Sequence, residues 1–105
     1  MQTDQAILEK VFSHIDREEL AKLAMDVVSI PTPTGSEEEA ARFIHDWLQK
    51  QGIETFLQHT EPGRANVVGV IPGTGEGPTL LFNGHMDTAL AGTQEDLWIT
   101  KPGQA

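Results

Sequence analysis

The sequence predicts an α/β fold in which helices come first and three short strands follow. From residue 5 to residue 48, apolar residues recur at helical spacing in three stretches, as in helices that bury one face. After residue 52, the apolar residues fall instead in three short runs bounded by glycine, proline or charged residues, which is typical of strands. The change of period divides the chain into a helical first half and a second half of strands.

The first two stretches predict two helices separated by a break. The first helix is expected over residues 5–15, after a cap at Thr3 or Asp4. Asp16, with Glu19 three residues later, is an acidic variant of the capping box, a pairing that starts helices. We therefore expect the first helix to break near Asp16 and a second to continue to residue 28.

A proline-rich linker is expected to separate the second helix from the third. Residues 29–35 read Ser-Ile-Pro-Thr-Pro-Thr-Gly, and each proline lacks an amide proton and forces its predecessor into extended geometry. Ser36 with Glu39 then forms a second capping box before an apolar stripe that runs to residue 48. Gly52 is expected to end this helix as a left-handed cap.

Three strands are expected over residues 53–57, 66–71 and 79–82. Thr79-Leu80-Leu81-Phe82 is almost continuously apolar, which predicts a central strand covered on both faces, whereas polar residues mark the first strand as an edge. Covering both faces requires more elements than 105 residues supply. Residues 89–105 add no closing element, so we expect the chain to be cut off from a longer protein.

Composition excludes several classes of protein. The chain carries 7 Lys and Arg against 16 Asp and Glu, a net charge of −9, and no cysteine. Nucleic-acid binding is disfavoured because phosphates require clustered basic residues, and the lack of cysteine excludes disulfides, zinc knuckles and thiol nucleophiles. No apolar window is long enough to span a membrane, and the start of the chain is acidic rather than signal-like. We expect a cytoplasmic protein.

The candidate functional residues directly follow the most apolar run. Residues two apart in extended backbone project to the same side, so Asp87 can approach the imidazole of His85, select its tautomer and raise its basicity as a metal ligand. Gly84 would let an ion or substrate come close. From spacing alone the alternative is a hairpin turn at Asn83-Gly84, with His85 and Asp87 as polar positions on a returning strand.

The residues around this pair resemble a known family. Residues 81–88, Leu-Phe-Asn-Gly-His-Met-Asp-Thr, resemble the first metal-site signature of the M20 metallopeptidases and amidohydrolases, which include acetylornithine deacetylases, succinyl-diaminopimelate desuccinylases and certain carboxypeptidases. Residues 28–38 are similar to the family's linker between its first two helices, and residues 66–69 to its second strand. The likeness extends in matching order over residues 17–102.

The resemblance implies a fold and a site. The fold is the amino-terminal portion of a mixed-sheet catalytic domain of the zinc-exopeptidase type, over residues 1–105, with the rest of that domain and any lid or dimerisation domain absent. His85 would ligate one of two zinc ions, or Co²⁺ or Mn²⁺ in their place, and Asp87 would be the catalytic residue that orients it. A metal-bridged water would attack an amide carbonyl. The bridging aspartate, the glutamate base and the other ligands would fall beyond Ala105, because Glu95 and Asp96 come too soon to match.

The parent protein is therefore expected to be a metal-dependent hydrolase of small peptides or N-acyl amino acids, with a homodimer as one expectation for its assembly. The 105-residue chain alone is expected to be inactive, to bind no metal tightly and to self-associate through exposed strand edges. The alternative is a noncatalytic α/β module that reuses the same fold for protein association.

Overall fold

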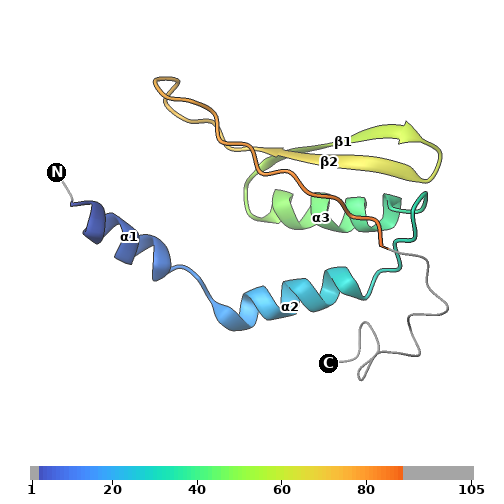
Figure 1. Cartoon of the computed structure of the whole chain (residues 1–105), viewed down its shortest axis with the longest axis horizontal. Helices are drawn as coiled ribbons and strands as arrows, with labels where there is room; N and C mark the ends of the chain where they lie inside the picture. Colours follow the sequence, from blue (N-terminus) through green and yellow to red (C-terminus); the bar gives the residue numbers. More distant parts are fainter. Residues whose placement is uncertain (1–2, 89–105) are drawn as a thin grey trace.

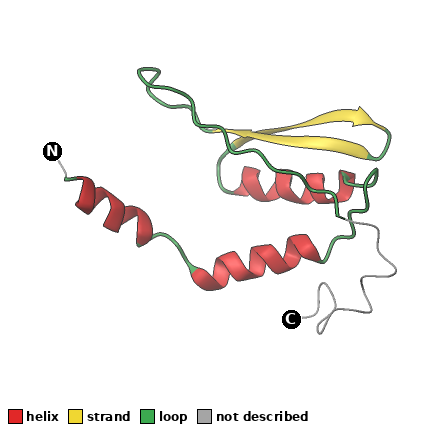
Figure 2. Cartoon of the chain, viewed as in Figure 1, coloured by secondary structure: helices red, strands yellow, loops and turns green. Residues whose placement is uncertain are grey.

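The computed structural model of the chain describes residues 3–88 as three helices followed by one antiparallel hairpin (Figures 1 and 2). Helix α1 covers Asp4–Phe12, α2 covers Arg17–Val28 and α3 covers Glu38–Lys50. Strand β1 covers Glu54–Glu61 and β2 covers Arg64–Val70. The predicted α/β class and the order of helices before strands are confirmed for this part of the chain.

Local capping explains where the first two helices begin. The Thr3 hydroxyl accepts a hydrogen bond of 3.2 Å from the Ala6 amide and so caps α1. Asp16 is extended, and its carboxylate accepts from the Glu18 and Glu19 amides at 2.9 and 3.3 Å. The expected break near Asp16 is thus confirmed, since a residue that caps α2 in extended geometry cannot continue α1.

The start of α3 differs from the prediction. The helix begins at Glu38, and the residue before it, Glu37, makes no side-chain cap bond, so the predicted capping box between Ser36 and Glu39 is wrong. The Glu38 amide donates to the Gly63 carbonyl at 3.1 Å instead. A turn distant in sequence therefore satisfies a donor that the capping box would have satisfied locally.

The close packing of the described chain lies between α3 and the hairpin. Ala40 and Ala41 on α3 and Ala65 on β2 are at most 4% exposed. Such small side chains let a helix approach a sheet closely. Most apolar side chains of α1 and α2 are open to solvent, with Phe12 61% and Leu20 60% exposed, whereas Leu23 and Val27 on α2 are half-buried. Figure 1 shows α1 apart from the packed unit of α3, β1 and β2, whereas α2 runs below α3.

The hairpin is longer than the two predicted strands. Its antiparallel register pairs Glu54 with Val70 at the open end and Glu61 with Arg64 beside the turn. The predicted runs, 53–57 and 66–71, cover the more apolar part of each strand and extend one residue beyond it, at Ile53 and Ile71. Polar residues extend the ladder because a two-stranded sheet needs only backbone partners along one edge. The helix before it ends at Lys50, and Gly52, two residues later, has a φ of +79°, the left-handed cap that the sequence predicts.

The third predicted strand does not form within residues 3–88, and the prediction over 79–82 is wrong for this structure. The segment lies outside any strand, and Leu80, Leu81 and Phe82 are 77%, 81% and 88% exposed. The physical reason is pairing: an apolar run becomes a central strand only when neighbours hydrogen-bond to it on both edges. Within residues 3–88 the sheet contains β1 and β2 alone, and neither is paired with residues 79–82.

The helices of residues 3–88 include none whose length and apolar character would suffice to cross a membrane.

Candidate functional site

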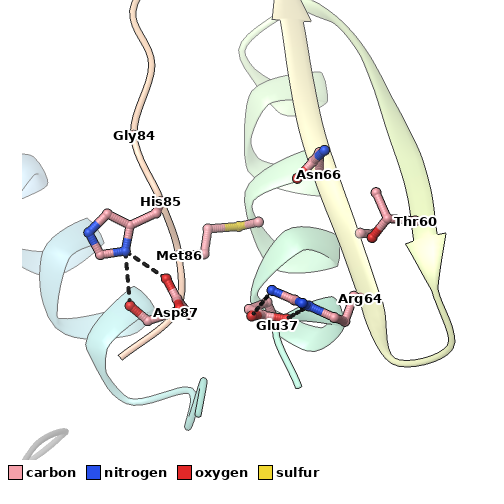
Figure 3. Close-up of a pocket in the computed structure, with 9 residues that line it drawn as sticks. Glu37, Thr60, Arg64, Asn66, Gly84, His85, Met86 and Asp87 are labelled. Atoms are coloured by element: carbon pink, nitrogen blue, oxygen red, sulfur yellow. Dashed lines mark hydrogen bonds and ion pairs between the residues drawn. The ribbon is translucent and has the colours of Figure 1, made fainter. Parts of the chain in front are cut away.

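The predicted site residues, 84–87, lie on a segment that runs beside the linker and beside the hairpin. Residues 84–87 line a pocket together with Glu37, which precedes α3, and with residues of β1 and β2 (Figure 3). The pocket has a volume of about 150 Å³, below the roughly 300–1,000 Å³ of sites that enclose small molecules. The described residues therefore form one wall of a site rather than a closed cavity.

His85 and Asp87 form the pair that their spacing predicts. The imidazole Nδ1 lies 2.7 Å from Asp87 Oδ1 and 3.1 Å from the Asp87 carbonyl oxygen. Carboxylate and carbonyl oxygens only accept hydrogen bonds, so Nδ1 carries the proton and Nε2 of the neutral ring keeps its lone pair. The side chain is 84% exposed, and among residues 3–88 no group hydrogen-bonds to Nε2. The second ring nitrogen, Nε2, thus keeps a lone pair that could accept from a ligand or bind a metal ion (Figure 3).

The Asp87 carboxylate is held by a second segment as well. Its Oδ2 accepts a 2.8 Å hydrogen bond from the Thr34 hydroxyl, which belongs to the proline-rich linker. The hydrogen bond from Thr34 first, and then that from His85, hold the pKa of the Asp87 carboxyl below its usual value. Asp87 is therefore a carboxylate at neutral pH, as the imidazole proton requires.

Backbone contacts dock the linker against the same segment. Thr88 donates from its amide to the Thr32 carbonyl at 2.7 Å, and its hydroxyl reaches the same oxygen at 3.2 Å. Pro33 and Thr88 form an isolated parallel bridge. The hydrogen-bonded residues of the two segments are 53 and 56 positions apart in sequence, yet they lie side by side at the site.

An ion pair anchors the other end of the linker to the hairpin. The Arg64 guanidinium donates two bonds of 3.0 Å to the Glu37 carboxylate, whose side chain is only 7% exposed. Glu37 also accepts from the Gly35 amide at 3.0 Å. The bond with Arg64, and then that with Gly35, lower the pKa of Glu37, while Glu37 raises that of Arg64. The pair fixes residues 35–37 at the edge of the pocket (Figure 3).

The hairpin alternative at Asn83-Gly84 is not what the structure shows. A two-residue turn of type I′ needs positive φ at both central residues. Neither Asn83 nor Gly84 has a positive φ, and no strand lies on either side of them within the described chain. A β-carbon added at Gly84 would meet nothing within 4 Å.

Three partners in the site were not expected from sequence. They are Thr34, Glu37 and Arg64, none of which the sequence singles out as a site residue. Their contacts join residues 53 and 27 positions apart, and no local spacing signals such pairs. Within residues 3–88 no group of three or more His, Asp or Glu residues is arranged to hold a metal ion. Glu95 and Asp96, which the sequence assigned to no site, lie outside the described residues.

Curated proteins similar to this chain are hydrolases by name. The chain is 40% identical over 74 residues to a protein of Pyrococcus abyssi named as a LysW-lysine/LysW-ornithine hydrolase, which covers 70% of this chain and 20% of that protein. It is 31% identical over 107 residues to an N-formyl-4-amino-5-aminomethyl-2-methylpyrimidine deformylase of Halalkalibacterium halodurans, covering 95% of this chain and 25% of that protein.

A third relative agrees with these two. A protein of Staphylococcus epidermidis named as a succinyl-diaminopimelate desuccinylase is 32% identical over 88 residues, which is 84% of this chain and 21% of that protein. The chain thus spans about a quarter or less of the curated relatives it matches. No family model and no solved structure matches it. The matches to named hydrolases cover most of the chain, and they agree with the His-x-Asp signature and its linker: the chain belongs to the M20-type family of peptidases and amidohydrolases.

Proposed function

We propose that this chain is the amino-terminal part of a di-metal hydrolase that cleaves amide bonds, and that it supplies the first metal ligand. The observation that carries the proposal is the geometry of His85, whose Nδ1 is held 2.7 Å from Asp87 while Nε2 faces solvent. A carboxylate that holds one imidazole nitrogen is the usual support of a histidine metal ligand. Similarity to proteins named as hydrolases also supports a functional role for this pair.

The donor set fits one ligand of a metal site and no more. Zinc in proteins takes four or more ligands, of which protein side chains supply at least three at catalytic sites. Here both Asp87 oxygens already accept hydrogen bonds, from His85 and Thr34. His85 would therefore hold zinc, or Co²⁺ or Mn²⁺ in its place, only with ligands from elsewhere. When bound, the metal ions would polarise the amide carbonyl and activate water.

The substrate class follows from what the relatives share in name. One is a deformylase and another a desuccinylase, so each name describes removal of an acyl group. We infer that the parent protein acts on an amide between a small acyl group and an amine, such as an N-acyl amino acid or a small peptide. The open pocket beside His85 supports this only as one wall, since its volume of about 150 Å³ cannot enclose such a molecule.

A metal titration tests the role of His85 against a matched histidine in the same chain. His59 is also exposed and also lies beside a carboxylate, with its Nδ1 3.3 Å from Glu38. We expect Co²⁺ to broaden the ring proton resonances of His85 at lower concentrations than those of His59, because only His85 sits in the shared pocket with Asp87. Equal or preferential broadening of His59 would contradict the proposal.

The strength of binding tests whether the site is partial. We expect calorimetric titration with zinc ions to show no micromolar site in the isolated chain, and no amidase activity, because one histidine cannot complete the metal shell. Micromolar binding that is lost in His85→Ala would show a complete site and would contradict the proposal.

The coding sequence separates the hydrolase from a noncatalytic module. For the hydrolase we expect the reading frame to continue past Ala105 to an aspartate and then to a pair of glutamates. A stop codon directly after Ala105, together with a monodisperse chain that melts cooperatively, would favour a protein-association module instead.

A further inference from the structure

A turn in the linker presents one hydroxyl to the site. The Ser36 amide donates to the Pro33 carbonyl at 2.9 Å and closes a four-residue turn. Gly35, at its third position, has a φ of +101°, which is the pattern of a type II turn. Thr34 occupies the second position, and its hydroxyl donates to Asp87 Oδ2. The Glu37 carboxylate also holds this turn, because it accepts a hydrogen bond from the Gly35 amide.

The two oxygens of Asp87 are divided between two donors. Oδ2 accepts from Thr34 at 2.8 Å, and Oδ1 accepts from the His85 ring at 2.7 Å. A carboxylate with one partner rotates freely about its last bond, whereas two partners on opposite oxygens fix its plane. The His85 side chain is 84% exposed, so packing does not hold the ring. The orientation of the ring therefore depends on the Asp87 carboxylate, and the orientation of that carboxylate depends on the hydrogen bond from Thr34.

We propose that Thr34 is a positioning residue for the metal site: its hydroxyl fixes the Asp87 carboxylate so that the neutral His85 ring keeps its proton on Nδ1 and turns the Nε2 lone pair outward. This inference deepens the proposed function and rests on it, because an outward Nε2 matters only if His85 is a ligand. The proline-rich linker is then part of the site and not merely a connection between helices.

The competing role for Thr34 is simple attachment of the linker. Thr88 provides that attachment separately, through its amide and hydroxyl bonds to the Thr32 carbonyl at 2.7 and 3.2 Å. Removing the Thr34 hydroxyl therefore leaves the two segments docked. Thr88→Val is a matched control, because it removes a hydroxyl from the same pair of segments without touching Asp87.

The test is the tautomer of His85 in the 105-residue chain, measured by long-range ¹H–¹⁵N correlation at a pH where the ring is neutral. In the wild type we expect Nδ1 to show the shift of a protonated nitrogen and Nε2 that of a lone-pair nitrogen. Thr34→Val should shift both values toward those of a free histidine. Thr34→Ser should restore the wild-type pattern, and Thr88→Val should leave it unchanged. The His59 ring gives an internal reference.

Two further variants make the result decisive. Asp87→Asn should shift the His85 pattern in every case, because it removes the charged acceptor itself. If Asp87→Asn shifts the pattern and Thr34→Val does not, the carboxylate is held without Thr34 and the inference is overturned. Thr34→Ala replaces Thr34→Val if the amide spectrum shows that valine disturbs the hairpin. These outcomes are independent of the Co²⁺ titration, so failure of the metal proposal and failure of the Thr34 inference are distinguishable.

Discussion

Replacing Gly35 by alanine should destabilise the described fold through backbone strain alone. Gly35 has a φ of +101°, a conformation that residues with a β-carbon rarely adopt. The turn that it completes carries the Pro33–Ser36 hydrogen bond and one of the bonds to Glu37. A β-carbon added at Gly35 would meet nothing within 4 Å, so no steric contact contributes to the effect.

The magnitude follows from two opposing terms. An L-residue in left-handed geometry costs about 1–2 kcal/mol. The lower conformational freedom of alanine in the unfolded chain returns about 0.4–1 kcal/mol. The expected net loss is about 1 kcal/mol in the free energy of unfolding, or roughly a fivefold change in the ratio of folded to unfolded chain.

Urea unfolding followed by circular dichroism at low protein concentration measures this loss. With an m-value of about 1 kcal/mol/M, the midpoint should fall by about 1 M with the slope unchanged. Gly73→Ala is the control, because Gly73 has no positive φ and an added β-carbon there also meets open space. If Gly35→Ala unfolds at the same urea concentration as Gly73→Ala, the reasoning from the turn is refuted.

Three other predictions concern charge and exposed apolar surface. At neutral pH, Glu37→Gln should lower the unfolding midpoint clearly more than Glu39→Gln, because only Glu37 is paired with a guanidinium; equal midpoints would contradict this. The pKa of Glu37 is lower in the folded chain than in the unfolded chain, so the unfolded chain binds more protons in acid. The stability that Glu37 contributes is therefore present above the usual glutamate pKa and is lost as the pH falls through the lower pKa of the folded chain. The acid limb of a pH titration by circular dichroism should therefore be flatter in Glu37→Gln than in Glu39→Gln, and identical limbs would exclude the effect. Phe82 is 88% exposed, so Phe82→Ser should reduce concentration-dependent association in sedimentation velocity, whereas Thr79→Ser should not; unchanged association in both would show that this segment is not responsible.

Local signals in the sequence predicted the features that depend on neighbouring residues. Asp16 caps α2 because its carboxylate needs only the nearby amides of Glu18 and Glu19. Gly52 follows the end of α3 in a left-handed conformation, with a φ of +79°, which glycine adopts without steric cost. The approach of Asp87 to His85 belongs to the same class, since the two residues are two positions apart.

Features that depend on distant partners were missed or predicted wrongly. The capping box at Ser36 failed because Gly63, far along the chain, accepts from the Glu38 amide. The prediction of a strand over residues 79–82 was wrong because apolar character indicates that a segment can be buried but does not identify the segment that would pair with it. The bond from Thr34 to Asp87 spans 53 positions and has no signature at either end.

The alternating prolines of the linker give it a one-sided hydrogen-bonding capacity. In extended backbone, successive residues direct their amide and carbonyl groups to opposite edges. The Thr32 carbonyl points toward Thr88 and accepts a hydrogen bond from its amide. The backbone groups of Pro31 and Pro33 therefore point to the other edge, where neither proline has an N–H to donate. Another strand arriving from that direction would find no donor on either proline, and the Pro33 carbonyl already accepts from the Ser36 amide, so the ladder would stop there. The two proline rings that restrict the backbone of the linker thus also prevent further strands from adding to its outer edge.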